Sequence, residues 1–222
     1  LTQAKEQEVK ARNMALQTQI NPHFYYNTLS SIMVLAENGD NDTVAKMCRN
    51  LSLIMRYITD TGSTTVSLAD ELDYVQKYLY CMKVRYQSSL NYSIDVDESL
   101  LSEEVPKLLI QPLVENAIKY GTEGKVIIKI KKQLDNVIVS VVDQGPGVSD
   151  EDAQRIFGLF ERGQEMKKKV RGSGLGLFIS KAIIDAHGGT IGVSHDSGGG
   201  ACFYFSLPCK EVKKHDDSDS IL

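Results

Sequence analysis

The chain has 222 residues, of which 42% are hydrophobic and 24% are charged, and its formal net charge is −4. This composition is sufficient for one large or two smaller globular domains with a hydrophobic core. The net charge is slightly negative, and the sequence has no long run of Lys and Arg. It therefore gives little support for a nucleic-acid partner. The longest apolar runs are far shorter than the ~20 residues that a membrane-spanning helix needs.

Four cysteines are present, at Cys48, Cys81, Cys202 and Cys209, and none of them forms a CxxC pair. No cluster of His and Cys residues has the spacing of metal ligands. We expect free thiols in a reducing cytosol, with Cys48 and Cys202 acting as small buried hydrophobic side chains.

The start of the sequence predicts a helix that carries a histidine in an unusual setting. Residues 1–20 are rich in good helix formers, and the chain begins within this pattern, so we expect a fragment of a longer protein. One stripe of residues at helical spacing is typical of a coiled coil. Its members are Val9, Leu16, Ile20, His23 and Asn27. Pro22 predicts a kink beside His23, after which the helix continues to about Leu35.

A second amphipathic helix is predicted at about 43–59, after a polar turn at 37–42. Two helices joined by such a loop form an antiparallel hairpin. A lone hairpin buries too little surface to be stable, so we expect a homodimer in which two hairpins form a four-helix bundle. Ser67 is predicted to cap a third helix that ends near Arg85.

From about residue 90 the pattern changes to a mixture of strands and helices. Pro106 is predicted to start an apolar helix that ends at Gly121. The expected elements are strands at 91–96, 126–131, 137–142, 190–195 and 201–207, and helices at 107–120 and 175–186.

The sequence therefore predicts an α+β protein in two units. The first is a helical region at 1–66, and the second is an α+β region at 67–208. The tail at 209–222 is polar and is expected to be disordered.

Two segments of the second unit point to a nucleotide. Asn116 lies in an apolar helix, where its amide either holds a metal ion against phosphate oxygens or bonds to a neighbouring strand. Asp143 follows a strand and precedes Gly145 and Gly147. Its carboxylate could accept a hydrogen bond from the exocyclic amine of adenine, with the glycines allowing close approach of a flat ligand. The alternative for this segment is an ordinary turn at the exit of a hairpin.

Two later segments add to this pattern. Gly172, Gly174 and Gly176 precede a helix, whose free N–H groups would make an anion site. Phe157 and Phe160, followed by the lysines at 167–169, suit a lid over a triphosphate, although the lysines could equally belong to a solvated loop.

In this order, the four segments resemble the N, G1, F and G2 boxes of the GHKL ATP-binding fold. The resemblance covers about 105–208 and implies an α/β sandwich that binds ATP and Mg. It implies that Asn116 holds Mg, that Lys119 and Tyr120 lie beside the phosphates and base, and that Asp143 binds the adenine amine. The implied lid and phosphate contacts are Gly145, Gly147, Gly172, Gly174, Leu175 and Gly176.

Hydrolytic members of this fold carry a glutamate four residues before the metal-binding asparagine, where it activates water. Here that position is Pro112. An ATPase or chaperone function is therefore less favoured, and the phosphoryl group needs another acceptor. The neutral imidazole of His23 could be that acceptor.

The segment 19–27 closely resembles the His-box of the LytS/YesM-type sensor histidine kinases, with the pattern Gln-x-Asn-Pro-His-Phe-x-x-Asn. Segments 108–117, 68–72, 78–79 and 85–86 also match this family. The resemblance implies a dimeric kinase that phosphorylates His23 and passes the phosphoryl group to an aspartate of a response regulator. It also implies that the chain is the cytoplasmic part of a membrane-anchored protein.

Some roles stay open at this point. Phe24 stands where commoner kinases have an acidic residue, so no acceptor for the imidazole proton is assigned. Asn27 could orient a water for dephosphorylating the regulator, or could bond the backbone near Pro22. His187 is predicted to lie at the end of a helix, and His195 is predicted to lie on the surface. The alternatives to a kinase are a catalytically silent ATP-binding dimeric module and a serine kinase or anti-sigma-type protein.

Overall fold

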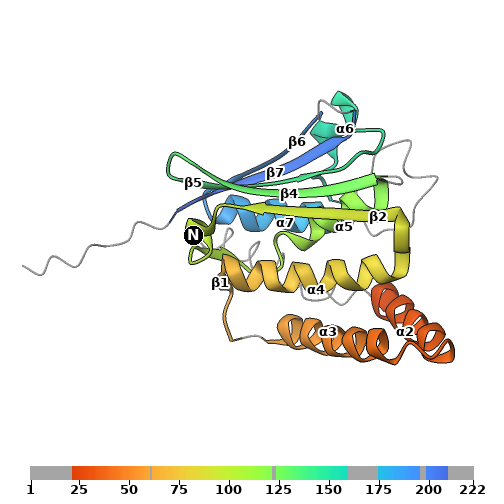
Figure 1. The fold of residues 1–222 in the computed structure, drawn as a ribbon. Helices are drawn as coiled ribbons and strands as arrows, with labels where there is room; N and C mark the ends of the chain where they lie inside the picture. Colours follow the sequence, from red (N-terminus) through yellow and green to blue (C-terminus); the bar gives the residue numbers. More distant parts are fainter. Residues whose placement is uncertain (1–21, 61, 122–123, 160–174, 196–198, 210–222) are drawn as a thin grey trace, which may run out of the picture.

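The structure is a computed structural model, which describes residues 22–60, 62–121, 124–159, 175–195 and 199–209. A helical layer at one side of the molecule lies against a long helix, which in turn lies against a helix-backed sheet (Figure 1). No helix in the described ranges is long and apolar enough to cross a membrane.

The helical layer consists of α2 (Pro22–Glu37) and α3 (Asn41–Thr59), which pack against each other and against α4. The turn between them uses Gly39 at φ +77°, and the Asp40 carboxylate caps α3 by accepting from the Thr43 N–H at 3.2 Å. The predicted helix at about 43–59 is confirmed, and the helix that carries His23 is confirmed from Pro22 onward. The predicted stripe at Val9, Leu16 and Ile20 lies outside the described residues.

The long helix α4 (Leu68–Tyr86) lies between the α2–α3 layer and the sheet (Figure 1). Ser67 caps it as predicted, because its hydroxyl oxygen accepts from the Asp70 N–H at 3.1 Å. Nine of its residues are buried. This wide apolar surface explains how one helix can pack on two layers.

The five-stranded sheet has the order β2-β4-β5-β7-β6, in which β2 pairs parallel with β4 and every other pair is antiparallel. Its strands are β2 (Leu90–Val96), β4 (Gly124–Gln133), β5 (Asn136–Val142), β6 (Thr190–His195) and β7 (Ala201–Pro208). Alternate residues of β4 are buried and exposed, as in a sheet with one covered face. The helices α5 (Gln111–Tyr120) and α7 (Gly176–Ala186) cover the face toward α4 (Figure 1). The α+β fold is therefore confirmed.

The remaining elements are short. They are the antiparallel pair β1 (Thr65–Ser67) and β3 (Glu104–Pro106), the helix α6 (Asp150–Arg155), and the 3-10 turns η1 (Gln87–Ser89) and η2 (Glu98–Leu100).

Two predictions about local structure were wrong. The helix expected at 107–120 begins at Gln111, because Pro106 lies in β3 and Leu108 has φ +61°. A non-glycine residue at that φ cannot continue a right-handed helix. Cys48 is exposed rather than buried, whereas Cys81 is buried and Cys202 is half-buried.

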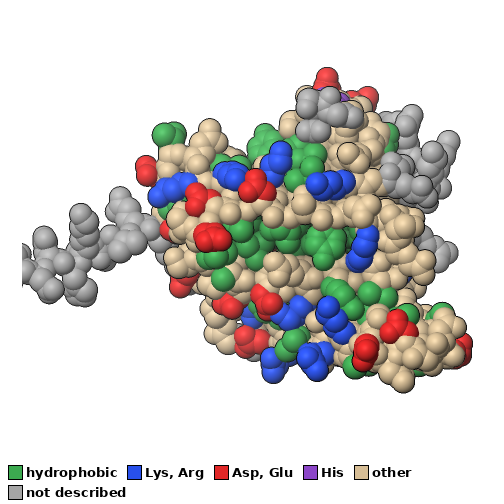
Figure 2. All heavy atoms as spheres, viewed as in Figure 1, with side chains coloured by type: hydrophobic (Ala, Val, Ile, Leu, Met, Phe, Trp, Pro, Cys, Tyr) green, Lys and Arg blue, Asp and Glu red, His purple; other side chains and the backbone are tan. Residues whose placement is uncertain are grey.

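On the face shown in Figure 2, the Lys and Arg side chains are interspersed with Asp and Glu side chains. Among the described residues visible there, no continuous basic stripe is formed.

Candidate functional site

The candidate phosphate acceptor, His23, is an exposed residue in the first turn of α2. The next residue, Phe24, is buried and its ring lies 5.0 Å from the ring of Tyr78 in α4. Residue 28, one turn after Phe24, is also buried, and the Thr28 hydroxyl donates to the Phe24 carbonyl at 2.8 Å. Phe24 stands where commoner kinases have an acidic residue, and here it packs in the core. This packing fixes which face of α2 carries His23 to the surface.

Asn27 lies one helical turn after His23, on the same exposed face. Its amide nitrogen is 3.1 Å from Nδ1 and 3.1 Å from Nε2 of the imidazole. The amide is thus within hydrogen-bonding distance of either ring nitrogen, whichever one carries the proton.

The helix α5 carries the next group of predicted residues. Asn116, Lys119 and Tyr120 are all half-buried. Glu115 lies 4.0 Å from Lys119 and accepts from the Gln111 amide at 3.1 Å. Both expected roles of Asn116, holding a metal ion and bonding to a neighbouring strand, stay predictions.

Asp143 lies directly after β5 and is 3% exposed. Its Oδ1 accepts from the Gly145 N–H at 2.9 Å and from the Ala201 N–H at 3.2 Å. One donor lies in the turn that follows β5 and the other lies in β7. The two bonds together hold the carboxylate in one orientation.

Close backbone packing brings Asp143 and the end of α5 together. A Cβ on Gly121 would lie 2.8 Å from Cβ of Asp143, and one on Gly145 would lie 2.5 Å from the Tyr120 carbonyl oxygen. Neither position has room for a side chain. Gly145 packs closely on the protein's own backbone, and its expected contact with a ligand stays a prediction. Gly147 is required for a different reason, since its φ is +77°.

The fourth predicted segment is only partly described. Leu175 and Gly176 lie at the start of α7, where a Cβ on Gly176 would lie 3.7 Å from Cβ of Pro112. The start of α7 therefore adjoins the start of α5. Gly172 and Gly174, and the predicted lid from residue 160 to 169, lie outside the described residues.

Two family models match the chain. The model described as histidine kinase-, DNA gyrase B- and HSP90-like ATPase matches residues 102–211, and the model described as histidine kinase matches residues 11–90. The chain belongs to the histidine kinase family.

Among curated relatives of this histidine kinase, the sensor histidine kinase YesM of Bacillus subtilis (strain 168) is 32% identical over 216 residues. The sensor protein LytS of Oceanobacillus iheyensis is 31% identical over 215 residues. Each alignment covers 93% of the chain but only 34% and 36% of the respective relative. The resemblance to LytS/YesM-type kinases is thereby confirmed, and the chain spans about a third of these relatives' length.

Solved structures agree with the assignment. The catalytic domain of the histidine kinase ThkA is 30% identical with a TM-score of 0.54, covering 66% of this chain and 95% of that one. The full-length ShkA structure in complex with AMPPNP is 25% identical with a TM-score of 0.53, covering 80% of this chain and 38% of that one.

The family of this chain implies that it binds ATP, and its residues would be compatible with a magnesium ion on the phosphates. The Asn116 amide would supply a hard oxygen ligand of the kind Mg²⁺ prefers, and phosphate oxygens and water would supply the rest. The described residues contain no group of three or more His, Cys, Asp or Glu side chains that could hold a metal ion.

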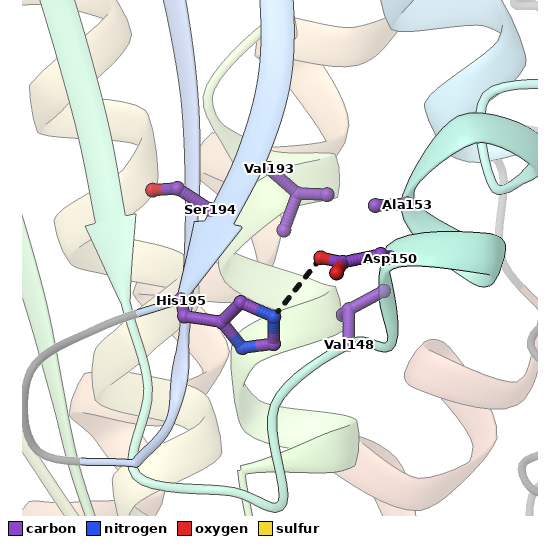
Figure 3. A pocket seen from close by; sticks show the side chains of 6 residues that line it. All are labelled: Val148, Asp150, Ala153, Val193, Ser194 and His195. Carbon is purple, nitrogen blue, oxygen red and sulfur yellow. Dashed lines mark ion pairs between the residues drawn. The ribbon is translucent and has the colours of Figure 1, made fainter.

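A separate hollow of about 270 Å³ lies between α6 and β6. Asp150 and His195 point toward one another across it, with Nε2 of His195 3.5 Å from Oδ1 of Asp150 (Figure 3). Both side chains are more than half exposed. Its lining contains none of the residues predicted to bind the nucleotide, and His195 is a surface residue as predicted.

His187 lies at the end of a helix, as predicted. It caps the end of α7, where its Nδ1 lies 2.7 Å from the Ile183 carbonyl oxygen.

Sequence reasoning missed one residue that shapes the site. Glu71 lies in the first turn of α4, where it is fully buried and accepts hydrogen bonds from the segment before α5. Burial raises the pKa of this carboxyl, and the hydrogen bonds that it accepts oppose the rise. An acidic residue one turn into a helix gives no sequence signal for such burial.

Proposed function

We propose that this chain is an ATP-dependent protein-histidine kinase that phosphorylates His23 and passes the phosphoryl group to an aspartate of a response-regulator receiver domain. The observation that carries the proposal is the exposed His23, with Asn27 beside its ring, on a helix anchored by the buried Phe24. The nucleotide site proposed from Asn116 and Asp143 would supply the donor.

In the proposed first step, an imidazole nitrogen of His23 attacks the γ-phosphorus of ATP. A P–N bond forms as the bond to the β-phosphate oxygen breaks, and ADP leaves. Bound Mg²⁺ would offset the charge on the β- and γ-phosphates, and Asn116 is the residue that would hold it.

The other proposed nucleotide contacts come from α5, from Asp143 and from the glycine-containing segments. Lys119 and Tyr120 would lie beside the phosphates and base, and the Asp143 carboxylate would accept from the adenine amine. Gly145, Gly147 and the segment at 172–176 would complete the phosphate and lid contacts.

The structure of α5 favours a histidine acceptor over water. Pro112 is in the first turn of α5 and carries no group that could remove a proton from water. Glu115, the acidic residue in α5, instead lies near Gln111 and Lys119.

We further propose that residues 1–66 form the dimerisation and phosphotransfer region and 67–208 the ATP-binding region. Apart from Cys209, the tail expected at 209–222 lies outside the described residues. Exposed apolar side chains on α2 and α3 support a homodimer through these helices. They are Tyr26, Leu29, Met33, Val34 and Met55. The parent protein would be membrane-anchored, with this region in the cytoplasm.

The deciding experiment is incubation with γ-labelled ATP, using His23→Gln and the control His195→Gln, which changes another exposed histidine. Wild type and His195→Gln are expected to gain acid-labile, base-stable phosphate, and His23→Gln none. Acid-stable label, or label that persists in His23→Gln, would contradict the proposal and favour a serine kinase. Nucleotide binding without label in wild type would instead favour a catalytically silent dimeric module.

A further inference from the structure

The buried Glu71 carboxylate joins two parts of the molecule. Its Oε1 accepts from the N–H groups of Leu109 at 2.9 Å and Ile110 at 3.1 Å. Its Oε2 accepts from the N–H of Leu108 at 2.9 Å and from the hydroxyl of Tyr57 at 2.6 Å. Three of these donors belong to the segment before α5, and the fourth, Tyr57, belongs to α3.

On one side, the carboxylate fixes where α5 begins. The first N–H groups of a helix have no partner within it, and the residue at the start of α5, Ile110, makes no side-chain cap. Leu108 is held at φ +61°, a conformation that a leucine adopts only when its surroundings enforce it. Since α5 has ten residues, its start decides where Asn116 and Lys119 lie.

On the other side, the same segment is attached to the end of α3. The ring of Tyr57 stacks on Tyr74 of α4 at 4.6 Å and lies under the Lys107 ammonium at 4.8 Å. Lys107 also lies 3.0 Å from both the carboxylate and the carbonyl oxygen of Asp60. A shift of α3 relative to α4 would therefore disturb residues 107–110 directly.

We propose that Tyr57 and Glu71 form a connector that couples nucleotide binding at α5 to the position of α3. In this proposal Tyr57 is a positioning residue: it acts on the nucleotide through Glu71 and the start of α5. The coupling is reciprocal, because a ligand that favours one arrangement of the connector also stabilises the position of α3 that allows it. The inference rests on the nucleotide site of the proposed function, but it needs no phosphoryl transfer.

The first test is nucleotide affinity, measured by calorimetry with AMPPNP and Mg²⁺ on the full chain. Tyr57→Phe removes only the hydroxyl that reaches Glu71. Tyr80→Phe is the matched control, since Tyr80 lies at the same α3–α4 contact with the Lys46 ammonium 4.4 Å from its ring. We expect Tyr57→Phe to raise the dissociation constant about five-fold or more, within the usual range of coupling between sites. Tyr80→Phe is expected to bind like wild type.

The second test is hydrogen–deuterium exchange, which separates a coupling role from a purely structural one. Without nucleotide, the amides of residues 108–110 should exchange faster in Tyr57→Phe than in wild type. Adding AMPPNP should slow exchange at the end of α3, residues 52–59, in wild type and in Tyr80→Phe but not in Tyr57→Phe. The connector is overturned if Tyr57→Phe keeps wild-type affinity, or if AMPPNP leaves α3 of the wild type unchanged. If wild type binds AMPPNP but is not labelled by ATP, the proposed kinase function fails while this test still decides the coupling.

Discussion

The amide nitrogen of Asn27 lies 3.1 Å from each ring nitrogen of His23, one turn along the same helix. Because both residues belong to α2, the helix backbone fixes their relationship without help from a loop or a second segment. The Asn27 amide thus keeps a constant position beside the imidazole.

We expect Asn27→Ala to slow autophosphorylation of His23. Loss of one orienting hydrogen bond of about 1.4 kcal/mol corresponds to roughly a ten-fold lower rate. The initial rate of labelling at saturating ATP measures this effect. Ser30→Ala is the control, since Ser30 is exposed on α2 and its hydroxyl donates to the Tyr26 carbonyl at 2.9 Å. Labelling of Asn27→Ala at the wild-type rate would assign Asn27 to dephosphorylation or to the backbone instead.

Asp143→Asn is expected to weaken nucleotide binding while leaving the fold intact. The substitution keeps the size of a buried side chain but replaces the charged acceptor proposed for the adenine amine. A hydrogen bond to a charged group contributes about 1.5–3 kcal/mol, so the dissociation constant for ATP should rise roughly ten-fold to a hundred-fold. Calorimetry measures the constant, and circular dichroism checks the fold. A folded Asp143→Asn variant with wild-type affinity would mean that the base binds elsewhere.

Met33→Glu is expected to weaken the proposed homodimer. Met33 is 62% exposed in the single chain and lies one turn after Leu29, which is 49% exposed. A carboxylate placed in an apolar interface loses its hydration without gaining a partner, so the dimer dissociation constant should rise at least about ten-fold. Sedimentation velocity over a concentration series measures it. Gln133→Glu adds the same charge at an exposed position on β4 and should have no effect. An unchanged dimer in Met33→Glu would exclude this face of α2 from the interface.

The cysteines should differ strongly in reactivity. Cys81 is 1% exposed, and burial raises the pKa of its thiol to about 12. Since the thiolate is the reactive form, Cys81 should resist a thiol reagent at pH 8 until the chain unfolds. The exposed Cys48 should react in the folded state. Peptide mapping after timed alkylation distinguishes the two, and Cys48→Ser should remove the fast fraction. Rapid modification of Cys81 in the folded chain would show that α4 opens readily.

Several features of the site were readable from the sequence because each depends on neighbours in the chain. The helix of His23 and Asn27 and the cap at Ser67 all follow from local spacing and side-chain chemistry. The strand that ends before Asp143 follows from alternation over a few residues.

Other features were not readable because they depend on residues far apart in the chain. The start of α5 was misplaced since Glu71, 39 residues before Ile110, binds its N–H groups and takes the place of a local cap. The close approach of Gly145 to the carbonyl of Tyr120, which lies in an earlier helix, has no signal in the sequence. Cys48 was expected in the core, but its side of α3 is not covered by any described element.

The sequence by itself determined the order of the elements, the phosphate acceptor candidate and the family, because these depend on residue types at fixed spacing. Only the tertiary structure decided how the parts meet: α4 between the α2–α3 layer and the sheet, α5 against the turn at Asp143, and Tyr57 on Glu71. The physical reason is that a buried carboxylate must find its hydrogen-bond donors wherever packing brings them, and packing is a property of the whole chain.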